Sequence, residues 1–213
     1  MVCPFNIRAM KPEEFKCGDC RLCEDKNNQV NKFDNDLEKA KAFEEELKEY
    51  VLKNTGLTFV KNTKHKTADL SFYKRNQLIC RVEAKLLGGR AATFMESKIG
   101  LSGKESLVVD EPKYEHYVKT NKEDNLNSYF YIPTFVVWRF NRPCKDFGGI
   151  TVFEEIQTLD QIYKKHPERK FERKTNENDI KNGTKLGVTR KTHFSISEML
   201  PIYELTFWIF KAI

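Results

Sequence analysis

The sequence predicts an α/β protein in which a mixed β-sheet is flanked by helices. Short apolar runs typical of strands alternate along the chain with segments whose apolar residues recur at helical spacing. The 213 residues can bury a substantial core, and 12% aromatic residues exclude a disordered chain. Two prominent apolar runs, residues 135–138 and 207–210, are strand-sized and too short to span a membrane.

The N-terminus carries no apolar stretch of the kind found in secretory signal peptides. Together with the short apolar runs, this predicts an intracellular, cytoplasmic protein with no membrane partner.

The first predicted element is a helix over residues 35–52. Five apolar residues recur there at helical spacing: Ala40, Phe43, Leu47, Tyr50 and Val51. Asp34 or Asp36 is suited to cap its start, and Gly56 fits just past its end.

Residues 68–86 predict a β-hairpin with charged residues on one face. In its second strand an apolar set alternates with a charged set: Leu78, Cys80, Val82, Ala84 and Leu86 against Arg81, Glu83 and Lys85. A three-residue loop at 75–77 brings the apolar residues of both strands to one face and sets Asp69 opposite Glu83. Because adjacent carboxylates repel, the pattern predicts a cation between them, and a divalent metal suits it best.

Later elements follow from the same patterns. We expect strands at residues 107–109, 129–140, 150–153 and 193–196, helices at 112–120 and 159–165, and a helix or loop across 93–103.

The spacing Asp69-x13-Glu83-x-Lys85 on a hairpin that follows a helix resembles the PD-(D/E)XK phosphodiesterase superfamily, which includes restriction enzymes, Holliday-junction resolvases and RecB-type nucleases. The resemblance covers residues 37–140 and implies a restriction endonuclease-like core. It implies that Asp69, Glu83 and the main-chain carbonyl of Ala84 bind Mg²⁺, and that Lys85 positions or activates the attacking water. The family's usual proline before the aspartate is Ala68 here.

The chemistry of these residue types points the same way. Carboxylate oxygens suit Mg²⁺ or Mn²⁺, and a metal beside a lysine provides an activated water and charge stabilisation for phosphodiester hydrolysis. The alternative is an exposed strand whose Glu and Lys form ordinary surface pairs.

Resolvase-like members also carry a glutamate on the first helix, about three residues before a core leucine. Glu44 stands in that relation to Leu47, so the resemblance implies an auxiliary metal or water contact at Glu44. Glu45 and Glu46 are alternatives, and a helix this acidic is also compatible with simple solvation.

The activity that the resemblance implies is Mg²⁺-dependent hydrolysis of DNA phosphodiester bonds by a restriction-like endonuclease. Two alternatives stay open: a structure-specific or RNA-directed nuclease of the same fold, and a non-catalytic zinc-module protein that binds nucleic acid. Since many such endonucleases dimerise, a homodimer is a further expectation.

The C-terminal quarter is basic and supplies candidate DNA contacts. The net charge is +6, and the segment from Gln161 to the last residue contains 11 Lys and Arg but only 6 acidic residues. One segment interleaves bases with an aromatic residue, as expected of a loop that follows a phosphate backbone. Its basic residues are Lys164, Lys165, Arg169, Lys170, Arg173 and Lys174. A solvated basic surface is the alternative.

Four of the six cysteines crowd the N-terminus: Cys3, Cys17, Cys20 and Cys23. Because disulfides are reduced inside cells, four thiolates in this spacing indicate Zn²⁺ or a [4Fe–4S] cluster. Zinc is favoured, since related cluster-containing nucleases place cysteines on both sides of the core. Four free thiols are the alternative. Residues 1–32 are thus predicted as a metal-binding module and linker, and 33–213 as the nuclease domain with its basic C-terminal region.

The cysteine assignment predicts about one tightly bound metal ion per chain. Cys17→Ser or Cys20→Ser should release it, because each removes one of four thiolate ligands. Elemental analysis of the purified protein distinguishes zinc from iron. A protein that folds normally without metal would contradict the assignment.

Overall fold

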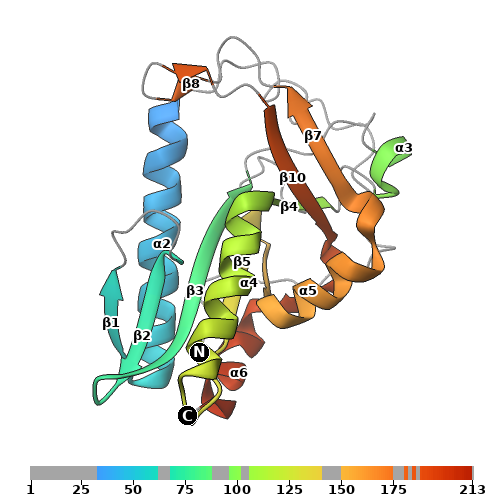
Figure 1. The fold of residues 1–213 in the computed structure, drawn as a ribbon. Coiled ribbons are helices and arrows are strands. Elements are labelled where there is room, and N and C mark those ends of the chain that lie inside the picture. The colour runs from blue at the N-terminus through green and yellow to red at the C-terminus, as the bar shows by residue number, and fades with distance from the viewer. Residues whose placement is uncertain are drawn as a thin grey trace.

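The computed structural model describes residues 33–61, 68–87, 96–101, 106–140, 150–174, 180–181, 184–185 and 188–212 (Figure 1). These residues form a mixed α/β structure in which helices lie on both sides of a mixed sheet, as the sequence predicts. The predicted cysteine module, residues 1–32, lies outside the described residues.

Helices and strands alternate along most of the chain. In order they are α2 (Phe33–Thr55), β1 (Thr58–Lys61), β2 (Leu70–Lys74), β3 (Gln77–Leu87), α3 (Glu96–Ile99), β4 (Ser106–Asp110), α4 (Glu111–Leu126), β5 (Thr134–Phe140), β6 (Thr151–Glu155), α5 (Ile156–Lys165), the 3₁₀ turn η3 (Pro167–Arg169), β7 (Lys170–Lys174), β8 (Ile180–Lys181), β9 (Thr184–Lys185), β10 (Val188–Ser195), η4 (Ile196–Glu198), β11 (Leu200–Pro201), η5 (Ile202–Glu204) and α6 (Leu205–Lys211).

The main sheet has six strands in the order β1-β2-β3-β5-β6-β11. Adjacent strands in this sheet are antiparallel, except for β3 and β5, which run parallel. The chain between these two parallel strands contains α3, β4 and α4.

Central strand β5 is buried on both faces and separates two hydrophobic cores. Phe135 and Val137 pack with residues of α2 and α6, whereas Val136 and Trp138 pack with residues of α4 and α5. This alternation is the period-two pattern of a strand covered on both sides.

A second sheet with the strand order β4-β10-β7 packs beside the α4 and α5 side of the molecule (Figure 1). All its pairs are antiparallel, and Phe194 of β10 joins the core that contains Trp138. The predicted strands at 107–109 and 193–196 therefore pair with each other across a long stretch of chain.

Helix α2 begins at Phe33, before the predicted start, so that Asp34 and Asp36 lie inside it rather than capping it. The helix continues to Thr55, three residues beyond the predicted range, and Gly56 lies just past its end as predicted. Gly56 has a φ of +67°, and its N–H donates to the Leu52 carbonyl at 3.0 Å, which closes the last turn.

The β2–β3 turn differs from the predicted three-residue loop. Lys74 pairs with Gln77 across a two-residue turn at Arg75 and Asn76, whose φ angles are 48° and 67°. A register shift next to Phe72 supplies the extra residue, so the strands still reach the predicted register beyond it.

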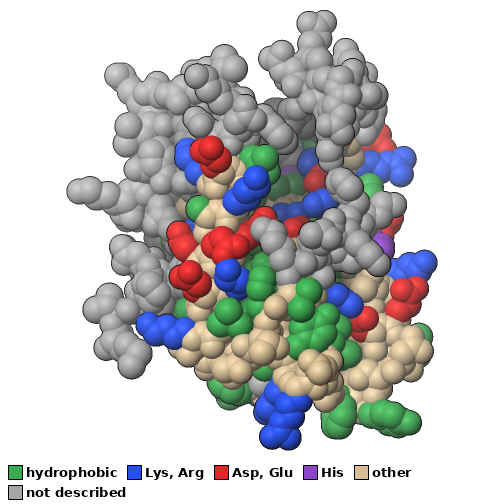
Figure 2. All heavy atoms as spheres, turned by 90° about the vertical axis from the view of Figure 1, so that its left-hand side faces the viewer, with side chains coloured by type: hydrophobic (Ala, Val, Ile, Leu, Met, Phe, Trp, Pro, Cys, Tyr) green, Lys and Arg blue, Asp and Glu red, His purple; other side chains and the backbone are tan. Residues whose placement is uncertain are grey.

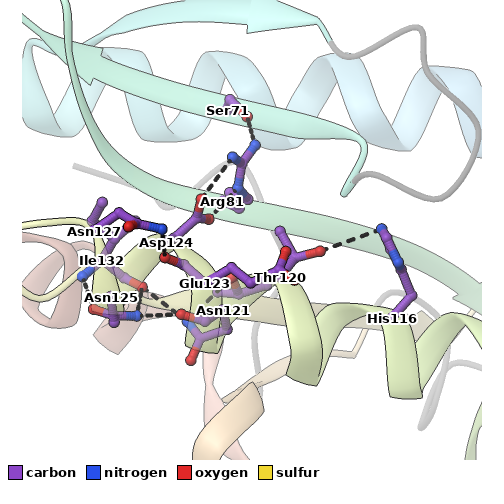
Figure 3. A network of polar contacts seen from close by, with 11 residues as sticks. Ser71, Arg81, His116, Thr120, Asn121, Glu123, Asp124, Asn125, Asn127 and Ile132 are labelled. Carbon is purple, nitrogen blue, oxygen red and sulfur yellow. Dashed lines mark hydrogen bonds and ion pairs between the residues drawn. The ribbon is translucent and has the colours of Figure 1, made fainter.

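Helix α4 lies along the polar face of β3 and is fixed there by Arg81 (Figure 3). The Arg81 guanidinium donates to both Asp124 carboxylate oxygens, at 2.7 and 3.3 Å, and to Ser71 Oγ at 3.1 Å. In the same network Asn121 and Asn125 both donate to the Ile132 carbonyl at 2.9 Å. These bonds tie the helix to β2, β3 and the entry to β5.

Among the described residues, no helix combines the length and apolar character that a membrane crossing requires.

The Arg81–Asp124 pair should contribute measurably to stability. Both side chains are less than one-fifth exposed, so Arg81→Ala or Asp124→Ala should each lower the free energy of unfolding by about 1–3 kcal/mol. A double-mutant cycle in urea measures their coupling. The exposed Lys119–Glu123 pair on the same helix is the control and should contribute about 0.3–0.5 kcal/mol. Equal coupling in the two cycles would contradict a special role for the buried pair.

Candidate active site

Asp69 directly precedes β2 and lies beside β3. The ladder pairs Leu70 with Val82, and the same register continued by one residue sets Asp69 opposite Glu83. The Ala84 N–H donates a 3.0 Å hydrogen bond to Asp69 Oδ2. The predicted register is therefore confirmed, and the Asp69 side chain bonds to the β3 main chain.

The main chain of Ala84 faces the same edge of β3. The Arg81 N–H donates to the Pro133 carbonyl at 3.0 Å, on the β5 side. Because strand residues turn their N–H and C=O groups alternately to the two sides, Ala84 presents both groups to the side on which Asp69 lies. An oxygen ligand from this main chain is thus available next to the two carboxylates.

Glu83 is buried, with only 1% of the residue exposed. Its Oε1 forms an ion pair with Lys85 Nζ and lies 3.8 Å from Lys113 Nζ of α4. Its Oε2 is buried and has no hydrogen-bond partner among the described residues. The sequence predicts a half-buried strand, but α4 covers its charged face at Glu83.

Tyr117 and Lys113 are site residues that the sequence pattern did not reveal. Tyr117 is 2% exposed, and among the described residues its hydroxyl makes no hydrogen bond of normal geometry. Burial raises the pKa of Tyr117, and the charges of Glu83, Asp69 and Asp110 raise it further. The available signal was the i, i+4 spacing of Lys113 and Tyr117 on a predicted helix.

Asp69 carries a perturbed carboxyl group. Burial raises its pKa from 3.8 to about 7, with the Glu83 carboxylate as the next contribution. The Ala84 N–H and Lys85 oppose this shift, while Glu44 adds to it. The structure therefore places Glu44 of α2 within electrostatic reach of Asp69.

The alternatives to Glu44 on α2 have other partners. Glu45 forms an ion pair with Lys48, and Glu46 accepts from Arg139 Nη1 at 2.5 Å. Figure 2 shows the side of the molecule that carries α2, where acidic side chains gather across the middle of the face with Lys and Arg among them.

Lys85 stays charged in spite of its position. Burial by itself lowers the pKa of Lys85, but Glu83 outweighs this effect, and Asp69 and Asp110 act in the same direction, so the pKa is raised. Asp110, the last residue of β4, in turn pairs with Lys191 of β10. Carboxylate and lysine side chains thus lie near one another from Asp69, beside β3, to Lys191 in the second sheet.

The described residues contain no group of three or more His, Cys, Asp or Glu side chains placed to hold a metal ion. A site at Asp69 and Glu83 would therefore offer two carboxylates and the Ala84 carbonyl. This set suits Mg²⁺, which keeps several waters and is commonly held by one or two carboxylates and substrate phosphates. Glu83 Oε2, which has no hydrogen-bond partner among the described residues, fits a site that binds a cation.

The basic segment is not the loop that the sequence predicts. Lys164 and Lys165 end α5, and Lys164 pairs with Asp160 at 2.5 Å. Arg169 lies in η3 and donates to both Glu198 carboxylate oxygens, at 2.8 and 2.7 Å, which indicates a structural role.

The remaining basic residues lie on β7. Lys170 Nζ lies 4.3 Å from the centre of the Tyr163 ring and 3.5 Å from Glu111. Arg173 and Lys174 continue this strand. Contact of these residues with DNA stays a prediction.

No protein-family model and no curated protein sequence matches the chain. Among solved structures, Hjc, a Holliday junction resolvase from the archaeal hyperthermophile Archaeoglobus fulgidus, is similar with a TM-score of 0.41 and 12% identity, over 79% of this chain and 96% of Hjc. D212, a nuclease from a fusselovirus, is similar with a TM-score of 0.39 and 9% identity, over 77% of this chain and 83% of D212.

The raised pKa of Asp69 predicts a pH-dependent stability. Since its pKa is 3.8 unperturbed and about 7 in the fold, the folded state binds more protons than the unfolded state between these values, and stability falls as pH rises. In the metal-free protein, Asp69→Asn should therefore stabilise by about 2–3 kcal/mol more at about pH 8 than at about pH 5. Urea unfolding in a chelator measures this difference.

Magnesium provides the control for that experiment. If Asp69 binds the metal, excess Mg²⁺ should stabilise the wild-type protein and reduce the advantage of the Asn variant at the higher pH. An advantage that does not change with pH would contradict the burial of an ionised carboxylate at this position.

Proposed function

We propose that this chain is a Mg²⁺-dependent nuclease that hydrolyses phosphodiester bonds of DNA, with a restriction endonuclease-like core and a restriction-like endonuclease activity. The observation that carries the proposal is the position of Asp69 opposite the buried Glu83. One carboxylate oxygen of Glu83 forms an ion pair with Lys85, and the other has no partner among the described residues.

The metal would be held by Asp69, Glu83 and the Ala84 carbonyl, with Mn²⁺ as an alternative to Mg²⁺. When bound, such an ion acts as a Lewis acid toward a phosphate and lowers the pKa of a bound water. The carboxylates are set for this role before any ion arrives, because the β-ladder and the Ala84 N–H fix their positions.

Three protein groups would act beside the metal. Lys85 keeps its proton, since its pKa is raised, and its ammonium stabilises negative charge that develops on the phosphate. Tyr117 is proposed as a positioning residue for Glu83, since the Glu83 carboxylate helps to raise the pKa of its hydroxyl. Glu44 is proposed as an auxiliary contact to water or metal, since its charge reaches Asp69.

The proposed partners follow from the same activity. Lys164, Lys165, Arg169, Lys170, Arg173 and Lys174 are proposed to contact the DNA backbone, although the Glu198 pair makes Arg169 the weakest of these candidates. We further propose that the protein forms a homodimer. The N-terminal cysteines are proposed to bind zinc, with a [4Fe–4S] cluster as the alternative; they are Cys3, Cys17, Cys20 and Cys23.

Asp69→Ala, Glu83→Ala and Lys85→Ala should each reduce cleavage of plasmid DNA by about 10²-fold or more, because each removes a metal ligand or a group that stabilises charge. DNA affinity should change little. Single-turnover cleavage in Mg²⁺, with a gel-shift assay in parallel, measures both properties.

Glu115→Ala and Lys119→Ala, at exposed positions of α4, are the matched controls and should cleave normally. Near-normal cleavage by any of the three site variants would overturn the assignment. A wild-type protein that shifts linear, branched and single-stranded substrates without cutting any of them would instead be a binding protein.

A further inference from the structure

Two lysines approach the same oxygen of Glu83, but they differ in exposure and in distance from it. Lys85 lies on β3, its side chain is 18% exposed, and it forms a direct ion pair with Glu83 Oε1. Lys113 lies on α4, its side chain is 46% exposed, and its Nζ is 3.8 Å from the same oxygen. At that separation Lys113 is a neighbouring charge rather than a hydrogen-bond donor.

This arrangement suits a protein without bound metal. A carboxylate buried as deeply as Glu83 is costly unless cations balance it. Lys85 lies close enough to Glu83 and Asp69 for both carboxylates to raise its pKa. Lys113, with its Nζ 3.8 Å from Glu83 Oε1, adds a second positive charge beside the buried carboxylate.

A divalent cation bound to the same carboxylates would itself balance their negative charge, so the nearby lysines would become unfavourable. Its charge would repel both ammonium groups. Lys85 is confined by its burial, whereas Lys113 has a half-exposed side chain on a helix surface and is free to move toward solvent. A DNA phosphate close to the metal is the anion that would receive it there.

We propose that Lys113 is a mobile counter-ion of Glu83 that a divalent metal displaces and that then contacts a phosphate of the DNA substrate. The inference rests on the proposed function. It assigns the two lysines different roles: Lys85 stays on the carboxylate, and Lys113 exchanges between protein and substrate.

The first test measures metal binding without DNA. Mn²⁺ binding, followed by electron paramagnetic resonance, should be roughly three- to tenfold tighter in Lys113→Met than in wild type, because a competing cation has been removed. Lys119→Met removes the same charge from the same helix and should bind Mn²⁺ as wild type does. Asp69→Asn should lose this binding, which identifies the site.

The second test measures cleavage at saturating Mg²⁺. Lys113→Met should raise the KM for DNA by roughly tenfold, the effect of one lost contact to a charged group, while kcat changes less. Lys113→Arg should retain cleavage, because it keeps a cation that reaches phosphate. Tighter metal binding together with poorer cleavage is the expected signature.

The outcomes separate the two proposals. Unchanged or weaker Mn²⁺ binding in Lys113→Met would overturn the counter-ion role, since a lysine that merely holds Glu83 in place gives that result. Tighter Mn²⁺ binding with unaltered KM would overturn the phosphate contact. Absence of cleavage by the wild-type protein, with the Mn²⁺ results as expected, would overturn the nuclease and leave the metal competition standing.

Discussion

The burial of the Glu83 carboxylate is the constraint on which the rest of the site depends. Parallel pairing with β5 and coverage by α4 remove Glu83 from water, and an ion in that position needs opposite charge nearby. Lys85 and Lys113 provide it from two different elements. In the resulting cluster Asp69 and Asp110 raise the pKa of both Lys85 and Tyr117.

The hairpin supplies geometric precision that the charges alone would not. A two-residue turn and a register shift together set the position of β2 along β3, and the hydrogen bond from Ala84 then fixes the Asp69 carboxylate at the end of the ladder. Arg81 completes the frame, because it joins β2, β3 and α4 through Ser71 and Asp124. The charged groups are thus mounted on regular secondary structure that is itself cross-linked.

Local patterns predicted the local features of this structure. Alternation along residues 78–86 gave the register of Asp69 and Glu83, and Gly56 marked the end of α2, because both follow from short-range geometry. The approach of Lys113 and Tyr117 to Glu83 was not predictable in this way, since the face that α4 presents depends on packing against β3.

Long-range pairing explains the other differences between sequence and structure. Strands β4, β7 and β10 form a separate sheet although they are far apart in the chain. Residues 207–210, a strand-sized apolar run, lie in α6, where Ile209 is buried and Phe207 and Phe210 are exposed. A run of four apolar residues fits either structure, and contact with α2 decides for the helix. The basic segment likewise forms a helix end, a 3₁₀ turn and a strand.

The bond between Ala84 and Asp69 also bears on whether another strand can add at this flank of β3. An N–H group on the flank of a strand is a point at which another polypeptide can add by β-pairing. In this protein an acidic side chain occupies the Ala84 N–H, so an incoming strand would have to displace a carboxylate and accept its charge beside its own carbonyl groups. The residue proposed for chemistry therefore also satisfies a main-chain donor of the sheet, and its loss would remove the acceptor of the Ala84 N–H as well as a ligand of the site.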